Sequence, residues 1–272
     1  MKKHLLFLLI LLSVHSFCQK TDTVDLKPLF GDYVGGFLLY DINTDSYIKY
    51  NPNQCATRFS PASTFKIPNS LIGLETGVIE DTASVFKYDS LLHPKDSVRL
   101  ATEPFKHWYE DLSLKMAFKY SCVWCYQDLA RREGEERIRK YMNDMQYGNM
   151  DISSGLESFW LCGSMEISIN EQVEFLRRMY LYELNGFSAK TIDAVKSIML
   201  FETTPDYKLY GKTGSGDCYG DKWIGWYVGF VETESGTKIF ALNLLGDDKI
   251  IKMNFRQELA KRIMSKLGAI KL

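Results

Sequence analysis

Segments with the alternating pattern of β-strands lie near both ends of the chain, and segments with helical periodicity lie between them. Residues 35–51 (GGFLLYDINTDSYIKYN) alternate weakly and break at residues 43–45, as a β-hairpin does. Residues 222–233 and 237–246 form a second predicted pair, joined at residues 234–236. The simplest architecture is an α/β (α+β) fold, in which both ends of the chain build an antiparallel sheet and a helical lobe is inserted between them.

The middle of the chain carries the predicted helical lobe. After Ser63, the apolar residues Ile67, Leu71, Leu74 and Val78 recur at the spacing of one helix face. Further helices are expected at residues 110–133, 135–145, 168–185 and 188–199, with loops at 82–108 and 146–164. The sheet lobe then spans about residues 19–62 and 200–272 and the helical lobe about 63–199. The cleft between the lobes is the expected active site.

The last part of the chain returns to strands and ends in a helix. Residues 207–216 (YKLYGKTGSG) predict a strand that ends in a glycine-rich turn. In residues 254–268, Asn254 is in position to cap a helix and Gly268 to end it. One face of this helix carries Phe255, Leu259, Ile263 and Leu267.

Composition limits the class of protein. The chain has 272 residues, 46% apolar and 25% charged, which is typical of a globular protein with one large domain or two lobes on a shared core. The net charge is −1, so no basic surface for nucleic acid or an anionic membrane is indicated.

Residues 1–18 have the features of a secretory signal peptide. Two lysines precede an apolar run at residues 5–14, which is too short for a comfortable membrane span. Small residues at positions 16 and 18 fit a cleavage site that leaves Gln19 first in the mature chain. A lipoprotein anchor on Cys18 is the less favoured alternative, because Phe17 is large for the preceding position.

Cysteine usage indicates buried thiols rather than a metal site. Of six cysteines, five remain after removal of the leader, at positions 55, 122, 125, 162 and 218. Cys122 and Cys125 form a C-x-x-C pattern, but no second pair or histidine cluster follows at zinc spacing. We expect small buried residues with one disulfide at most, its pairing left open. A bond between Cys122 and Cys125 would distort the predicted helix, so these two are expected to be free.

The stretch SPASTFKIPNSL (60–71) places a lysine among apolar residues. On a helix, Ser63 and Lys66 share a face, so the amine and the hydroxyl can meet. A serine nucleophile needs an adjacent base, and a lysine serves as one only when burial lowers its pKa. Alone, this S-x-x-K pattern is also found in helices by chance.

Two further elements follow in order. Ser121 precedes an apolar, aromatic helical segment, and Lys212 lies near the end of a predicted strand, before glycines that allow close approach to a ligand. Taken singly, the first is an ordinary serine at a helix N-terminus and the second a turn. S-x-x-K, S-x-V and K-T-G in this order form the pattern of penicillin-recognising serine enzymes.

The chain resembles the class D, oxacillinase-type, serine β-lactamases over most of its mature length. The matching stretches are STFK (63–66), SCV (121–123), YGN (147–149), FWLCGSMEIS (159–168), INEQVEFLRRMYLYEL (169–184) and KTG (212–214). The valine of S-x-V and the YGN triplet indicate class D, whereas the S-D-N motif and glutamate-bearing loop of class A are not found in the sequence. The implied fold is that of β-lactamases and penicillin-binding transpeptidases.

The resemblance implies a role for the buried lysine. Ser63 would be the acylated nucleophile, and Lys66 would react with CO2 to become an N-carboxylated lysine (N6-carboxylysine) that acts as general base. An apolar pocket favours the neutral amine that attacks CO2. Trp160 would donate its indole N–H to the buried carbamate.

The resemblance also assigns the proton relay and the oxyanion hole. Ser121 would pass a proton to the β-lactam nitrogen, supported by Lys212. The backbone N–H groups of Ser63 and Ser215 would stabilise the oxyanion.

Substrate contacts follow from the same resemblance. Thr213 and Arg256 would bind the substrate carboxylate. Gly214 would also be part of the substrate-binding site. For Arg256, a solvated charge on the last helix is the alternative. Val123 and Leu161 would cover the carbamate and gate water, or simply pack in the core. Residues 147–149 are interpreted as a structural turn, and residues 215–223 (SGDCYGDKW) as a loop that shapes the substrate range.

The resulting prediction is a protein, exported to the bacterial periplasm, that hydrolyses penicillin-type antibiotics and gives resistance. No bound cofactor or metal is expected beyond CO2 or bicarbonate, and the partner is a small-molecule β-lactam rather than nucleic acid or protein. The protein would be a monomer or a homodimer. A penicillin-binding D,D-peptidase and a non-hydrolysing β-lactam sensor domain share the motifs and are the alternatives.

Overall fold

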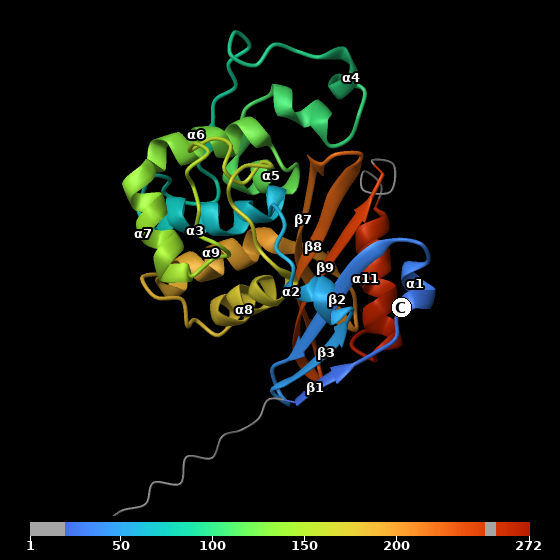
Figure 1. Cartoon of the computed structure of the whole chain (residues 1–272). Helices are drawn as coiled ribbons and strands as arrows, with labels where there is room; N and C mark the ends of the chain where they lie inside the picture. The colour runs from blue at the N-terminus through green and yellow to red at the C-terminus, as the bar shows by residue number, and fades with distance from the viewer. Residues whose placement is uncertain (1–19, 248–253) are drawn as a thin grey trace, which may run out of the picture.

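The computed structural model describes residues 20–247 and 254–272 and places a large sheet between a layer of helices and the C-terminal helix (Figure 1). The predicted leader, residues 1–18, lies outside the described residues. The sheet has seven strands in the order β1-β3-β2-β9-β8-β7-β6. They are β1 (Lys20–Thr23), β2 (Val34–Asp41), β3 (Ser46–Tyr50), β6 (Leu200–Thr203), β7 (Tyr207–Tyr219), β8 (Lys222–Thr233) and β9 (Gly236–Gly246).

Most of the helices come from the chain between β3 and β6. They are α2 (Pro52–Ala56), the 3₁₀ helix η1 (Ala62–Phe65), α3 (Lys66–Glu75), α4 (Ser97–Leu100), the 3₁₀ helix η2 (Phe105–Tyr109), α5 (Leu114–Lys119), α6 (Val123–Glu133), α7 (Glu135–Met145), α8 (Ile169–Tyr180) and α9 (Ala189–Met199). Two short strands in the same region, β4 (Val85–Phe86) and β5 (Leu112–Ser113), pair with each other. In the described part of the chain, no helix is both long and apolar enough to cross a membrane.

The predicted fold class is confirmed, because strands from both ends of the chain pair in one sheet. Strand β2 pairs antiparallel with β9, so that Leu38 lies opposite Ala241. The predicted hairpins are the β2–β3 and β8–β9 pairs. One pairing departs from the antiparallel pattern, since β1 runs parallel to β3.

Strand side chains alternate between two cores, one on each face of the sheet. In β2, Leu38 and Tyr40 join the larger core under the helical layer, whereas Phe37 and Leu39 join the smaller core. This is the period of two that a strand imposes. Helices α1 (Lys27–Phe30) and α11 (Phe255–Lys266) contact each other and contribute to the smaller core.

The C-terminal helix confirms its predicted apolar face, with Leu259 and Ile263 buried in the smaller core and Phe255 and Leu267 packed against it. The predicted capping is wrong in one detail. Asn254 occupies the N-cap position, but its side chain accepts no capping hydrogen bond, because its backbone is not in the extended conformation that aims an N-cap side chain at the first turn.

The predicted helix at residues 110–133 is wrong as a single element. Helix α5 ends at Lys119, and the N–H of Cys122 donates a hydrogen bond of 2.9 Å to the carbonyl of Ala117. Ser121 has a φ of 55°, which lies outside helical space, and α6 begins only at Val123. The apolar periodicity continues across this break, so periodicity alone could not locate it.

The predicted loop at residues 215–223 is also wrong. Strand β7 continues to Tyr219 and pairs with β8 along its length, leaving only a tight turn at residues 220–221. Gly214 and Gly216 therefore belong to the strand, whereas Gly220 lies in the turn. Among the other predicted helices, those at residues 135–145 and 188–199 are confirmed, whereas α8 ends at Tyr180 rather than at residue 185.

Where the site forms, one edge of β7 is not paired with another described strand. Strand β6 pairs with β7 only as far as Tyr210. Beyond that point, η1 rather than another described strand packs against β7. The sheet therefore presents the K-T-G segment to the turn that carries Ser63.

Candidate active site

Ser63 lies in the 3₁₀ turn η1, and Lys66 is the first residue of α3. The turn is closed by Pro61, whose carbonyl accepts hydrogen bonds from the N–H and the hydroxyl of Thr64. The Lys66 Nζ atom lies 3.2 Å from Ser63 Oγ and donates to it. The expected meeting of amine and hydroxyl is therefore present, although Ser63 belongs to a 3₁₀ turn rather than to the α-helix.

The Lys66 side chain is completely buried. This burial lowers the pKa of Lys66 from 10.5 to about 8. Its Nζ atom lies 4.9 Å from the centre of the Tyr126 ring. The face of the ring attracts a cation electrostatically, but it does not replace a hydrogen-bond acceptor. A much larger share of this amine is therefore neutral near pH 7 than for an exposed lysine.

Cys122 and Cys125 are buried free thiols, as predicted. Cys122 sits at the N-cap of α6 and Cys125 in its first turn, where its thiol donates to the Cys122 sulfur. Both pack in the same core cluster as Tyr126. They form part of the apolar wall that surrounds the Lys66 amine.

Ser121 and Lys212 meet across the interface of helices and sheet. The left-handed backbone of Ser121, between α5 and α6, brings its hydroxyl within 3.0 Å of Lys212 Nζ, which donates to it. Lys212 Nζ also donates to the carbonyl of Thr213 at 3.0 Å. Burial, with the positive charges of Lys66 and Arg256 nearby, holds the pKa of Lys212 well below its usual value. Ser121 thus lies beside an amine that can share a proton with it.

A cavity of about 320 Å³ opens in front of Ser63. From the helical side it is lined by Ser63, Ser121, Val123 and Leu161, and from the sheet side by Thr213, Gly214, Ser215 and Arg256. A neighbouring cavity of about 600 Å³ shares Ser121, Thr213 and Arg256 and adds Lys212. The structure therefore gathers these predicted residues around one space, with Lys66 and Trp160 buried outside the wall of the smaller cavity.

Gly214 is required by the close approach of β7 to η1. A Cβ atom at this position would lie 2.8 Å from the carbonyl oxygen of Pro61 and 3.1 Å from the N–H nitrogen of Thr64. On the other side, Arg256 donates to the carbonyl of Gly214. The Arg256 guanidinium is buried, which lowers its pKa to about 10, and its Nε has no hydrogen-bond partner among the described residues. Arg256 is thus a buried cation at the cavity rather than a solvated surface charge.

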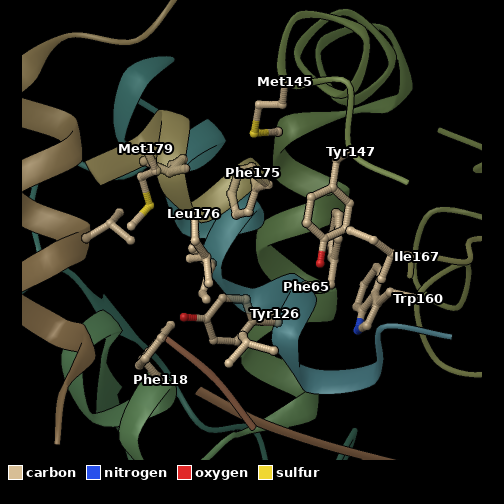
Figure 2. Packing of buried hydrophobic residues seen from close by; sticks show 14 of the residues in the cluster. Phe65, Phe118, Tyr126, Met145, Tyr147, Trp160, Ile167, Phe175, Leu176 and Met179 are labelled. Atoms are coloured by element: carbon tan, nitrogen blue, oxygen red, sulfur yellow. The ribbon is translucent and has the colours of Figure 1, made fainter. Parts of the chain in front are cut away.

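Trp160 packs against Phe65, the residue immediately before Lys66. Its ring stacks on Phe65 with centroids 5.3 Å apart, and both belong to an aromatic cluster with Tyr147 and Phe175 (Figure 2). The indole nitrogen of Trp160 is buried and has no acceptor among the described residues. A buried N–H without an acceptor is costly, which indicates that an acceptor absent from the polypeptide belongs there.

Residues 147–149 anchor the loop that carries Trp160. Gly148 has a φ of 56°, and a Cβ atom there would lie 2.2 Å from the carbonyl oxygen of Glu166. Asn149 donates from its side chain to the carbonyl of Ser164 at 2.8 Å. Tyr147 accepts a hydrogen bond from Gln172 and lines no cavity described above. These contacts fit the predicted structural role.

Several site residues were missed from the sequence. Residues 102–105 and Trp108 also line the smaller cavity, although residues 82–108 were expected to be only a loop. Trp223, in the stretch expected to shape the substrate range, lines it as well. The high aromatic content of residues 105–109 was the available signal. The disulfide between Cys162 and Cys218 was likewise not assigned, because pairing depends on the tertiary structure.

Comparison with known proteins identifies the family. The sequence model described as penicillin binding protein transpeptidase domain matches residues 35–267. The probable beta-lactamase YbxI of Bacillus subtilis is 35% identical over 258 residues, which cover 95% of this chain and 90% of the relative. Beta-lactamase OXA-48 of Klebsiella pneumoniae is 40% identical over 210 residues, 77% of this chain and 75% of the relative.

Solved structures of the same class decide the assignment. The class D beta-lactamase of Sebaldella termitidis superposes with a TM-score of 0.83 at 32% identity, covering 93% of this chain and all of the other. This chain belongs to the class D beta-lactamases. The Nostoc class D enzyme YbXI agrees, with a TM-score of 0.81 at 36% identity over 90% of this chain and 99% of the other.

Within this class D beta-lactamase, the described residues contain no group of three or more His, Cys, Asp or Glu side chains arranged to hold a metal ion.

A regulatory relative also matches. BlaR1 of Bacillus licheniformis is 34% identical over 86% of this chain, which spans only 37% of that longer protein. The class D fold is therefore shared by proteins named as enzymes and by one named as a regulator.

Proposed function

We propose that this protein hydrolyses the β-lactam ring of penicillin-type antibiotics through an acyl-enzyme on Ser63. The observation that carries the proposal is the convergence of two serine–lysine pairs on one cavity. Lys66 donates to Ser63 at 3.2 Å, and Lys212 donates to Ser121 at 3.0 Å. Ser63 and Ser121 both line the cavity of about 320 Å³, which is large enough for a bicyclic ligand core.

In acylation, Ser63 Oγ attacks the β-lactam carbonyl carbon and loses its proton to the adjacent base. The ring C–N bond breaks as the nitrogen receives a proton through Ser121, which Lys212 supports from its buried position. The backbone N–H groups of Ser63 and Ser215 stabilise the oxyanion, because η1 and β7 pack together at this point. The product is an ester on Ser63 with a secondary amine at the former ring nitrogen.

Deacylation releases the ring-opened acid. Water attacks the ester carbonyl, the bond to Ser63 Oγ breaks, and the serine hydroxyl is regenerated. Val123 and Leu161 line the cavity beside Ser63, so their side chains limit the approach of this water. Arg256 and Thr213 hold the substrate carboxylate at the other wall, where the guanidinium supplies a charge-assisted donor.

We also propose that Lys66 is carboxylated by CO2. The amine of Lys66 adds to the carbon of CO2 and releases one proton, which gives a carbamate. When present, this group supplies an anionic base beside Ser63. The residues fit it in two ways: burial lowers the pKa of the amine and so raises its neutral share, and the buried N–H of Trp160 lacks an acceptor among the described residues.

Export to the periplasm is part of the same proposal. The predicted signal peptide at residues 1–18 and a disulfide between Cys162 and Cys218 both fit an oxidising compartment. N-terminal sequencing of protein recovered from the periplasm of an expressing host would test this, and recovery of the uncleaved chain from the cytoplasm would contradict it.

The experiment for the main proposal is turnover of a penicillin by the purified mature protein, in buffer stripped of CO2 and after addition of bicarbonate. Hydrolysis is expected in bicarbonate and a much lower rate without it, and Ser63→Ala should show neither acylation nor turnover. Stable acylation without turnover in bicarbonate would instead support a penicillin-binding peptidase or a sensor. Equal turnover with and without CO2 would contradict the carboxylation of Lys66 but not hydrolysis through Ser63.

A further inference from the structure

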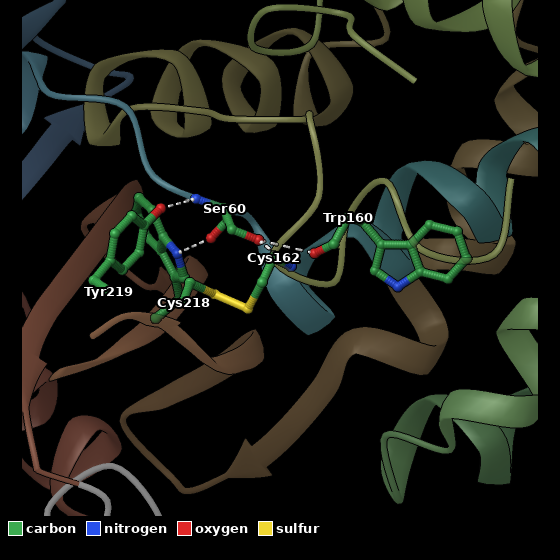
Figure 3. The surroundings of a disulfide bond; sticks show 6 residues. Ser60, Trp160, Cys162, Cys218 and Tyr219 are labelled. Atoms are coloured by element: carbon green, nitrogen blue, oxygen red, sulfur yellow. Dashed lines mark hydrogen bonds between the residues drawn. A yellow bond between two sulfur atoms is a disulfide. The ribbon is translucent and has the colours of Figure 1, made fainter. Parts of the chain in front are cut away.

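The segment that carries Trp160 and Leu161 is held at both of its ends by Ser60. The Ser60 hydroxyl donates to the carbonyl of Trp160 at 3.0 Å and accepts from the N–H of Cys162 at 3.0 Å (Figure 3). One hydroxyl group therefore brackets Leu161, whose side chain lines the cavity. Ser60 lies three residues before Ser63, so this bracket ties the segment to the turn of the nucleophile.

A disulfide holds the same segment to the sheet. Cys162 is bonded to Cys218, 56 residues away in the sequence, with a Cα–Cα distance of 5.1 Å. Figure 3 shows the bond next to Ser60 and Tyr219. The Tyr219 hydroxyl accepts a hydrogen bond from the N–H of Ser60 at 2.8 Å, so β7 is tied to both sides of the bracket.

The sequence of β7 provides the space that this bond needs. A Cβ atom at Gly216 would lie 2.8 Å from the sulfur of Cys218 and 2.9 Å from that of Cys162. The disulfide therefore lies directly against the strand, one residue beyond Ser215. It links the segment carrying Trp160 to the part of β7 that forms the cavity wall.

The backbone of Cys162 also depends on these contacts. Its φ of 58° is in the left-handed region, which is unfavourable for a residue with a Cβ atom. Such a conformation persists when the surroundings enforce it. Here the hydrogen bond to Ser60 and the bond to Cys218 both act on Cys162, two residues after Trp160.

We propose that Cys162 and Cys218 are positioning residues for carboxylation of Lys66. Their disulfide fixes the segment that carries the Trp160 N–H and the Leu161 side chain, which lines the cavity beside Ser63. Without it, the segment would lose its covalent tie to β7 and keep only non-covalent contacts, among them the Ser60 bracket and the stacking of Trp160 on Phe65, so the N–H would be aligned with the carbamate for less of the time. This inference rests on the proposed carboxylation, and it concerns how tightly CO2 is held rather than whether Ser63 is acylated.

The test is a bicarbonate titration of penicillin hydrolysis after removal of CO2, with the double variant Cys162→Ser/Cys218→Ser in the full mature chain. The bicarbonate concentration that gives half-maximal activity is expected to rise about tenfold or more, because loss of alignment weakens a positioned contact. Saturating bicarbonate should restore most of the rate. Cys55→Ser is the matched control, since Cys55 is a buried free thiol outside the cavities described above and donates to the carbonyl of Tyr50, as a serine would.

A general loss of folded protein would lower the maximal rate without moving the half-maximal bicarbonate concentration. A second measurement covers poor folding of the double variant. The folded wild-type protein is treated with a dithiol reductant, free thiols are counted, and the titration is repeated. Reduction should raise the half-maximal bicarbonate concentration of the wild type as the double variant does. The Cys55→Ser variant keeps the disulfide, so its reduction should raise that concentration by the same amount as in the wild type.

Identical titration curves for oxidised wild type, reduced wild type and double variant would overturn the positioning role while leaving carboxylation intact. A wild type that ignores bicarbonate would overturn carboxylation and this inference with it. The two failures are therefore distinguishable in one data set.

Discussion

At the scale of single residues, the site depends on polar groups that are buried without ordinary partners. The buried amine of Lys66 donates to the Ser63 hydroxyl and lies over the Tyr126 ring. The buried indole N–H of Trp160 has no acceptor among the described residues. Each alone is unfavourable, because burial removes water without replacing its hydrogen bonds. In the proposed carboxylation, the anion on Lys66 would accept the hydrogen bond of the Trp160 N–H.

Substituting Trp160 by phenylalanine tests the indole donor. Trp160→Phe keeps an aromatic ring against Phe65 but removes the N–H. The half-maximal bicarbonate concentration should rise about 10–100-fold, since a hydrogen bond to a charged group contributes about 1.5–3 kcal/mol. Tyr147→Phe is the control, because it removes another buried polar group from the same cluster. An unchanged bicarbonate requirement in Trp160→Phe would remove the indole from the role proposed for it.

The pKa of Lys66 predicts how carboxylation depends on pH. Because burial lowers this pKa to about 8, the neutral amine dominates above that pH and the ammonium form below it. Carbamate formation itself also releases a proton, so at constant dissolved CO2 the carboxylated fraction should fall as the pH decreases, by up to about a hundredfold per pH unit well below pH 8. Spectroscopy with ¹³C-labelled CO2 measures that fraction directly. A carbamate signal that stays constant from about pH 6 to pH 9 would contradict the assignment to Lys66.

At the scale of elements, the alternation of β7 explains why the glycines and the lysine stand where they do. Lys212, Gly214 and Gly216 are two residues apart and so share the face turned to the helical layer. The lysine reaches Ser121, while the glycines leave room for η1 and for the disulfide. The sequence showed these residues but suggested a turn, because glycine is common in both settings. Pairing with β8 decided in favour of the strand.

Adding one methyl group at Gly214 tests this packing. In Gly214→Ala, the new Cβ would press on the backbone of Pro61 and Thr64 and push β7 away from η1. We expect kcat/KM for a penicillin to fall by about 10–100-fold, because the nucleophile and the oxyanion donors would be misaligned. Gly36→Ala serves as a control, since the nearest atoms to a Cβ there are side-chain atoms 3.0–3.2 Å away and Gly36 lines neither cavity described above. Wild-type kinetics for Gly214→Ala would show that the close approach is not needed.

At the scale of the whole molecule, one sheet joins the two ends of the chain and the site forms where the inserted helices meet it. The cavity wall combines residues as far apart as Ser63, Ser121 and Arg256. The Cys162–Cys218 bond crosses the same junction, from the loop after α7 to the end of β7. It should therefore contribute to the stability of the fold as well as to the alignment of the site.

Removing the disulfide should lower the free energy of unfolding by about 4 kcal/mol, the chain-entropy value for a closed loop of this length. Denaturant titration of the Cys162→Ser/Cys218→Ser variant in bicarbonate measures this difference. The Cys55→Ser variant should lose much less, because it opens no closed loop. A double variant as stable as the wild type would show that the loop is already restricted in the unfolded chain.

The sequence by itself determined the chemistry and the fold class. The S-x-x-K, S-x-V and K-T-G motifs, with strands at both ends and helices between, sufficed because each depends on local spacing or on periodicity. Only the tertiary structure decided the break at Ser121, the extension of β7 and the pairing of Cys162 with Cys218. These features arise from contacts between segments far apart in the chain, where packing and backbone hydrogen bonding outweigh local preference.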